Sequence, residues 1–227
     1  MSTTLFSSDD VTVGLSVQTW NSLHSTHTGA DGAGPDIWFE NDIYVSVPVT
    51  FGKFTITPSY YLYQYPNGAF DSVQEGLVTV SYDDTSLWKD AGVQPYESFA
   101  LKPYLTVAYE LDDGNGSEDG YAEVGITPAY AANISGQEVS LSFPIALGLS
   151  YKDYFVKDNG DNDVLGYLSA GVQASVPISE SVIPAKYGTF AVTGGAYYIN
   201  LFSDSLEVAN NDSSNVFWGK VGFSWSY

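Results

Sequence analysis

Alternation of apolar with small or polar residues is the sequence feature that most constrains this fold. Successive side chains of a β-strand point to opposite faces, so a period of two predicts strands rather than helices. Ten stretches carry the pattern, at residues 11–20, 36–51, 53–64, 72–83, 100–111, 120–132, 138–152, 163–177, 187–201 and 215–227. Because no linker separates them, residues 1–227 are predicted to form a single all-β domain.

The two faces of the predicted strands differ in an informative way. In the stretch 138–152 one face carries Val139, Leu141, Phe143, Ile145, Leu147, Leu149 and Tyr151, and the other carries Ser140, Ser142, Pro144, Ala146, Gly148 and Ser150. A β-sandwich would bury the bulky face and present a charged face to water. Small and hydroxyl residues instead suit the interior of a barrel whose exterior contacts lipid. The sequence therefore predicts a transmembrane antiparallel up-and-down β-barrel of about ten strands.

The connections between the predicted strands also alternate. Acidic connections such as 112–120 and 158–163 alternate with less acidic ones such as 134–137. This indicates two distinct ends, an extracellular end with the acidic loops and a periplasmic end with both termini. Six prolines, at positions 48, 58, 103, 128, 144 and 177, argue against regular strands, because proline cannot donate to a ladder.

Composition excludes several classes of function. The chain has 27 acidic residues against seven lysines, a net charge of −20, so it repels phosphate backbones and no nucleic-acid partner is expected. It has no cysteine, which excludes disulfides and thiolate metal sites. The sequence shows no phosphate-binding loop, histidine cluster or cofactor motif, so no cofactor is expected. The first ten residues do not look like a secretion signal, and we expect that an export signal has been removed.

The closing stretch, "NVFWGKVGFSWSY", ends on an aromatic residue preceded by alternating apolar positions. It resembles the C-terminal assembly signal of bacterial outer-membrane β-barrel proteins, with Val221, Phe223, Trp225 and Tyr227 at the matching positions. The hairpin "GKFTITPSYYLYQYPNG" with "EGLVTVSYDD" is similar to small porins of the TorF-like kind. The resemblance implies a location in the bacterial outer membrane, with lipid, lipopolysaccharide and the barrel assembly machinery as partners. It also implies passive transport of small solutes or cations.

Parity along the strands selects the candidate pore-lining side chains. Those on the predicted interior face are Glu40, Asp42, Glu75, Lys102, Tyr104, Glu110, Tyr121, Glu123 and Lys220. Carboxylates in a confined passage concentrate cations, which predicts a narrow channel with an acidic outer mouth. Asp42 and Lys220 are expected near mid-height, where the first and last strands would meet. The tyrosines on the opposite face are expected at the lipid headgroups.

Other functions stay open at this stage. The same charged residues and tyrosines could fill a narrow barrel, which would give a non-conducting surface protein whose acidic loops bind partners or divalent ions. His24 and His27 could serve a rim enzyme, a protease or lipid A hydrolase, but no nucleophile motif accompanies them. We therefore predict no enzymatic activity and no catalytic residue. No metal site is predicted, because 112–120 and 158–163 lack the EF-hand spacing. A soluble carbohydrate-binding sandwich is the fourth class.

Overall fold

The described part of the chain folds mainly into β-structure, as the alternating sequence predicts. The computed structural model describes residues 1–24, 37–66, 68, 70–92, 99–112, 118–134 and 137–226. These residues form fourteen strands, two short α-helices and one 3-10 helix. The ladders that join the named strands are antiparallel. The all-β, antiparallel part of the predicted fold class is confirmed.

Two units divide the chain by their internal contacts. Unit 1 comprises Met1–Ser81, Leu105–Ala122 and Tyr151–Tyr154. Unit 2 comprises Tyr82–Tyr104, Glu123–Ser150 and Phe155–Tyr227. The prediction of a single domain over residues 1–227 stays a prediction.

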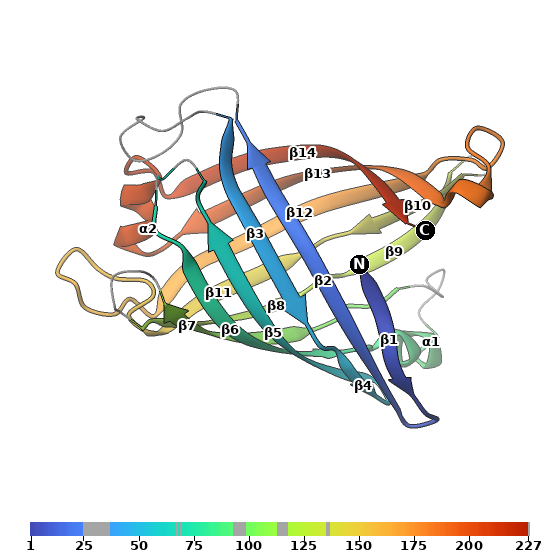
Figure 1. Cartoon of the computed structure of the whole chain (residues 1–227), viewed down its shortest axis with the longest axis horizontal. Helices are drawn as coiled ribbons and strands as arrows, with labels where there is room; N and C mark the ends of the chain where they lie inside the picture. The colour runs from blue at the N-terminus through green and yellow to red at the C-terminus, as the bar shows by residue number, and fades with distance from the viewer. Residues whose placement is uncertain are drawn as a thin grey trace. The chain divides into compact units, whose positions relative to one another are not determined.

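Unit 1 contains the N-terminal strands. Their bounds are β1 (Ser2–Ser7), β2 (Val11–Leu23), β3 (Trp38–Ser46), β4 (Val49–Phe51), β5 (Phe54–Gln64), β6 (Val73–Tyr82) and β7 (Tyr104–Asp112), of which Tyr82 and Tyr104 belong to unit 2. They pair in the order β1-β2-β3-β5-β6-β7, and β4 pairs with β2 and β5 (Figure 1). In this register Tyr44 lies opposite Tyr61. The stretch 11–20, predicted as the first strand, is part of β2, because an additional strand, β1, precedes it and pairs with its first half.

Unit 2 is built around one long strand. Its strands are β8 (Gly120–Ile126, which begins in unit 1), β9 (Ala129–Ile134), β10 (Gln137–Ser142), β11 (Ile145–Lys152, which ends in unit 1), β12 (Leu165–Pro177), β13 (Thr189–Leu201) and β14 (Asn215–Ser226). β11 pairs with the first half of β12 and β10 with its second half. β13 pairs along the whole of β12, β14 pairs with β13, and β9 pairs with β10.

Prolines explain why the predicted number of strands, about ten, is wrong. Pro48 separates β3 from β4, Pro128 separates β8 from β9, and Pro144 separates β10 from β11. Each lacks the N–H that would continue the ladder, so one predicted strand becomes two. Three divided strands and the additional strand β1 account for fourteen segments. Pro58 is tolerated inside β5, where its carbonyl accepts a hydrogen bond from the backbone N–H of Val47 at 2.9 Å.

The helices are short and lie in connections. α1 (Thr85–Asp90) follows β6, where the sequence allows a short helix within 84–99. η1 (Ala185–Tyr187) precedes β13, and α2 (Asp204–Ala209) joins β13 to β14. Among the described residues, no helix has the length and apolar character needed to cross a membrane.

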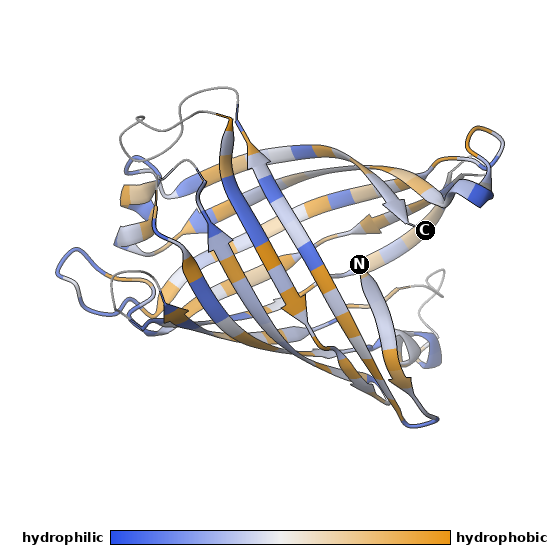
Figure 2. Ribbon diagram, viewed as in Figure 1, coloured by the Kyte–Doolittle hydropathy of each residue, from blue (hydrophilic) through white to orange (hydrophobic). Residues whose placement is uncertain are grey.

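The two faces of the strands are buried in the reverse of the usual order. On β7, Leu105 and Val107 are 45% and 42% exposed, whereas Ala108 on the opposite face is 0% exposed. On β6, Val78 is 44% exposed and Glu75 only 2%. Figure 2 shows this alternation of hydropathy along the strands. We refer to the face that carries Glu75 and Ala108, and its equivalents in other strands, as the polar face, and to the opposite one as the apolar face.

Candidate functional site

A buried carboxylate with three tyrosine donors lies on the polar face of unit 1. Glu75 of β6 is the acceptor. The hydroxyls of Tyr63 and Tyr121 donate to its Oε2 at 3.1 and 3.4 Å, and that of Tyr154 donates to its Oε1 at 3.4 Å. Among the described residues no lysine forms an ion pair with Glu75. The hydrogen-bond donors to its carboxyl group are therefore neutral phenols, which is uncommon for a buried acid.

A ladder of aromatic rings leads from Glu75 to a second buried acid. The ring centroids of Tyr63 and Tyr61 are 6.3 Å apart, and those of Tyr61 and Tyr44 are 4.5 Å apart. The rings meet edge to face, the favourable arrangement for aromatic pairs. Tyr44 in turn donates its hydroxyl hydrogen to Oδ2 of Asp42. The polar face of unit 1 is thus filled by tyrosines that connect two carboxylates.

Asp42 differs from Glu75 in how its oxygens are satisfied. It is 3% exposed, and its Oδ1 has no hydrogen-bond partner among the described residues. The carboxyl of Glu40, two residues earlier on the same face of β3, lies within hydrogen-bonding reach of Asp42, and the hydroxyl of Tyr65 lies within reach of Glu40. The site therefore brings two acids and two phenols together.

A cavity of about 430 Å³ adjoins this group of residues in unit 1. Tyr65 lines it, together with Glu110, Asp119 and Tyr154. The backbone N–H of Glu110 donates to the carbonyl of Asp119 at 2.9 Å, which holds the end of β7 against the start of β8. Three acidic side chains, with Asp71 the third, therefore border a space next to Glu40.

In unit 2 a third carboxylate repeats the arrangement with two tyrosines. Tyr104 donates to Oε1 of Glu123 at 2.7 Å, and Tyr167 donates to Oε2. Glycine makes room for both rings: a Cβ at Gly125 would lie 2.6 Å from the ring of Tyr104, and one at Gly148 would lie 2.3 Å from that of Tyr167. Both oxygens of Glu123 are therefore satisfied, as in Glu75.

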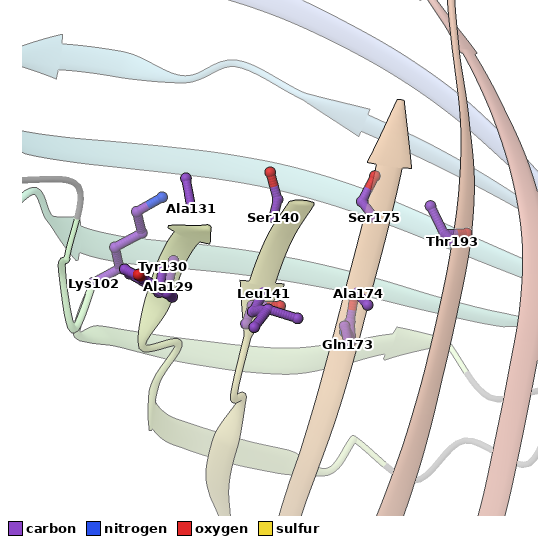
Figure 3. A pocket seen from close by; sticks show the side chains of 11 residues that line it. Lys102, Ala129, Tyr130, Ala131, Ser140, Leu141, Gln173, Ala174, Ser175 and Thr193 are labelled. Carbon is purple, nitrogen blue, oxygen red and sulfur yellow. The ribbon is translucent and has the colours of Figure 1, made fainter. Parts of the chain in front are cut away.

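Another part of the polar face of unit 2 is lined mainly by small side chains. Register places Ser140 opposite Ser175, and Ser175 opposite Thr193. In Figure 3 their side chains and that of Lys102 rise from the same side of the sheet, around a cavity of about 270 Å³. Serine, threonine and alanine make up most of the lining, and Lys102 contributes an ammonium group.

Lys102 is held in place through its backbone. Its φ is +49°, and its N–H donates to Oδ1 of Asp84 at 2.9 Å. Asp84 also accepts from the N–H of Leu101 at 3.0 Å and from the indole of Trp88 at 2.5 Å. Burial alone would raise the pKa of Asp84, but the hydrogen bonds from Trp88, Lys102 and Leu101 together hold it below its ordinary value. Asp84 thus joins the end of β6 to the start of β7.

The remaining predicted site residues lie on or near the last strand. The ammonium of Lys220 lies over the rings of Tyr197 and Trp218, 5.2 and 5.9 Å from their centroids. In the predicted assembly signal, Val221 is 87%, Phe223 66% and Trp225 64% exposed. The fourth signal residue, Tyr227, lies outside the described residues.

The histidines give no catalytic arrangement among the described residues. Nε2 of His24 lies 2.6 Å from the hydroxyl of Ser22, and its ring packs against Phe39 at 5.0 Å. No carboxylate that could orient the imidazole is bonded to it in the described part of the chain. His27 lies outside the described residues.

The structure brings together some predicted residues and adds others. Tyr121 joins Glu75, and Tyr104 joins Glu123, as their shared face predicts. The sequence analysis missed the tyrosines that complete these groups, which are Tyr44, Tyr61, Tyr63, Tyr65, Tyr154 and Tyr167. Parity was the available signal for Tyr61 and Tyr63, because both share a face with Ser59. Comparison of the chain with family models, curated proteins and solved structures gave no match.

Proposed function

We propose that this chain is an outer-membrane β-barrel that acts as a narrow passive channel for small solutes or cations. The observation that carries the proposal is the inverted burial of its strands. Large apolar side chains such as Val107 and Val78 are exposed, whereas Glu75 is almost fully buried. In water this pattern would leave a broad apolar surface exposed, whereas in a bilayer the same surface contacts acyl chains.

Unit 2 supports the same interpretation. On β12 the exposed side chains are Leu168, Val172 and Val176, at 40%, 43% and 37%. On β14, Val221 and Phe217 are the most exposed apolar residues. The membrane assignment and the bacterial location rest on this pattern and on the resemblance of the last strand to the assembly signal.

Transport through the barrel is supported by two features of the polar faces. The cavity in unit 1 is bordered by Glu110 and Asp119, and carboxylates concentrate cations at such an entrance. The lining of the cavity in unit 2 consists mostly of serine, threonine and alanine, with Lys102, Tyr130, Leu141 and Gln173 among them, and these small residues leave space for water and small solutes. The proposed passive transport needs no resident cofactor and includes no catalytic step.

A second function, a non-conducting surface barrel, is favoured by one specific observation. Asp42 and Glu75 are only 3% and 2% exposed because tyrosines cover them. A carboxylate that lines an aqueous path would be wetted, whereas one inside a packed network would be covered. The acidic loops would then carry the function by binding partners or divalent ions.

Membrane insertion is tested by a charge placed on the apolar face. Val107→Lys is expected to destabilise the chain folded into lipid vesicles by about 2–4 kcal/mol, because lysine near the bilayer midplane is costly. Thr106→Lys, on the polar face of the same strand, is the control and should cost less. Equal effects of the two variants, or a chain that folds without lipid or detergent, would rule out the membrane assignment.

Conduction is tested in planar bilayers. The wild-type chain should give steady currents with a reversal potential that shows a cation preference. Combining Glu40→Gln with Glu110→Gln should shift that potential towards zero, because both carboxylates belong to the acidic end of unit 1. Absence of any current from correctly folded protein would favour the non-conducting barrel.

A further inference from the structure

The cavity of about 270 Å³ in unit 2 differs from the tyrosine-filled face of unit 1 in how its polar groups are paired. In unit 1 the tyrosine hydroxyls donate to Glu75. In the cavity the hydroxyls of Ser140, Ser175 and Thr193 have no hydrogen-bond partner among the described residues. Polar groups that converge on a space without bonding to one another are available to a ligand.

Lys102 supplies the charge of this cavity from a strained backbone position. Four described residues other than glycine have a positive φ, and the other three are aspartate or asparagine, which tolerate that region better than lysine. The φ of +49° at Lys102 is maintained by the buried carboxylate of Asp84, which accepts the Lys102 N–H at 2.9 Å. Glycine or asparagine would cost less there, so the strain indicates a use for the lysine side chain.

The ammonium group of Lys102 is exposed in an unusual charge environment. The chain has 27 acidic residues and seven lysines, yet none of the described residues that line the cavity is acidic. Asp83 attracts Lys102 from the turn before α1, but its Oδ1 already accepts the hydroxyl and the N–H of Thr85 at 2.6 and 3.1 Å. The cavity therefore has a local positive potential in a chain whose net charge is −20.

The hydroxyl groups form a row that begins near Lys102. Register places Ser140 of β10 opposite Ser175 of β12, and Ser175 opposite Thr193 of β13. In Figure 3 Lys102 lies at one end of this row, and the three hydroxyl side chains rise on the same side of the sheet. Because neighbouring strands are about 4.8 Å apart, the row spans about 10 Å. The cavity thus presents one positive charge followed by a line of hydroxyl groups.

We propose that the cavity of unit 2 binds a small hydroxylated monocarboxylate, with its carboxylate at Lys102 and its hydroxyl groups along the row. One ammonium group matches one negative charge, through a charge-assisted hydrogen bond. Serine and threonine hydroxyls both donate and accept, so they can pair with the hydroxyls of such a ligand. The chain has no arginine, so it offers no bidentate clamp for phosphate. The volume is below the range of about 300–1,000 Å³ of pockets for drug-sized ligands, which limits the ligand to a small molecule.

This inference deepens the proposed function by naming a class of solute, and it rests on that function only for the route by which the solute enters. The lining residues belong to unit 2, and binding at equilibrium needs neither a bilayer nor a current. Binding to the full chain in detergent therefore tests the inference apart from transport. Currents from a chain that binds no carboxylate would remove this inference alone, whereas binding without currents would remove only the channel.

Saturation-transfer NMR detects weak ligands, and gluconate and sorbitol form a matched pair of probes. The two share their hydroxyl groups, but only gluconate has a carboxylate. We expect gluconate to bind the wild type about tenfold more tightly than sorbitol, because only the carboxylate makes a charge-assisted hydrogen bond. Lys102→Met should remove that preference, and Lys102→Arg, which keeps the charge, should retain it.

Two further variants separate the charge from the hydroxyl row. Thr193→Val keeps the shape of the side chain and removes its hydroxyl, so it should weaken both probes about threefold without changing their ratio. Lys186→Met removes an exposed lysine of η1 that does not line the cavity, and it should leave both probes unchanged. Far-UV circular dichroism would verify the fold of each variant.

Two results would overturn the proposal. One is a wild type that binds gluconate no better than sorbitol, or binds neither, which would mean that the cavity holds only water. The other is a preference for gluconate that persists in Lys102→Met, which would place the carboxylate at another lysine.

Discussion

The polar faces of unit 1 and unit 2 solve the same problem with different side chains. Unit 1 fills its face with tyrosines, which connect Asp42 to Glu75 through edge-to-face ring contacts and phenol hydrogen bonds. In unit 2 two tyrosines hydrogen-bond to Glu123, Tyr197 stacks on Trp218, and a cavity lies over Ser140, Ser175 and Thr193. The size of the side chain at alternate positions therefore decides where a polar face is packed and where it is open.

The two units also differ in how they hold buried negative charge. In unit 1 the donors to Asp42 and Glu75 are neutral phenols. Tyr44 lies on the same strand as Asp42, whereas Tyr63 of β5 and Tyr154 after β11 reach Glu75 of β6 from other segments. In unit 2 Asp84 is held by backbone N–H groups and an indole from its own connection. Phenol networks join strands that are distant in sequence, whereas the backbone donors around Asp84 fix a local turn.

The largest expected effect separates the two tyrosine groups. Glu75→Ala removes the shared acceptor of three phenol hydrogen bonds, and a hydrogen bond to a carboxylate contributes about 1.5–3 kcal/mol, so we expect a loss of about 4 kcal/mol in the free energy of unfolding. Glu123→Ala removes the acceptor of two phenol hydrogen bonds, and a loss of about 2 kcal/mol is expected. Urea unfolding followed by circular dichroism measures both. A larger loss for Glu123→Ala would reverse the comparison.

Removing the space behind a tyrosine in unit 2 is the next test. Gly148→Ala would place a Cβ 2.3 Å from the ring of Tyr167, which must then move away from Glu123. We expect a loss of about 2 kcal/mol, as for other overpacked positions. The matched control is Gly194→Ala, whose Cβ would have its nearest neighbour, the carbonyl of Lys220, at 3.7 Å. Equal unfolding free energies of the two variants would show that this close approach does not matter.

Asp84 gives a pH-dependent difference within unit 2. Its pKa is lower in the folded chain than its ordinary value of 3.8, so its ionised form stabilises the fold above that value. The stabilisation is lost as the pH falls through the lowered pKa. Asp84→Asn should therefore cost about 1.5 kcal/mol at neutral pH and progressively less below about pH 4. A constant difference between wild type and variant across this range would contradict the assignment.

The smallest effect on stability is expected for a change in the cavity of unit 2, which should alter conduction instead. Ser175→Trp puts a large ring into the cavity of unit 2. Val176→Trp, one residue further along β12, puts the same ring on the apolar face. If solutes pass over the hollow face, Ser175→Trp should lower the bilayer current several-fold and Val176→Trp should not. Similar currents from both variants would place the passage elsewhere.

Much of the local structure was predictable from the alternation. On β7 the apolar residues Leu105 and Val107 are exposed, and Ala108 on the opposite face is buried, as parity predicts. The predicted strand count failed at Pro48, Pro128 and Pro144, because the cost of a missing N–H depends on whether a neighbouring strand needs it at that residue. The strand β1 was missed because its six residues show too short a pattern.

The candidate site was predictable only in part. Parity placed Glu40, Asp42, Glu75 and Glu123 on the polar face, and the structure keeps them there with their tyrosines. Which tyrosine reaches which acid was not predictable, since Tyr63 and Tyr154 lie 12 and 79 residues from Glu75 in sequence. The partners were set by the register of separate strands and by the position of the segment after β11.

The sequence by itself determined that this chain forms strands with one apolar and one polar face, because successive side chains of a strand point to opposite sides and the alternation can be read from neighbouring residues. Only the tertiary structure decided that three phenols from separate segments donate to Glu75, whereas the phenol of Tyr44, on the same strand, donates to Asp42. Such a difference arises when distant strands pair, since hydrogen bonds between side chains depend on positions that no short stretch of sequence defines.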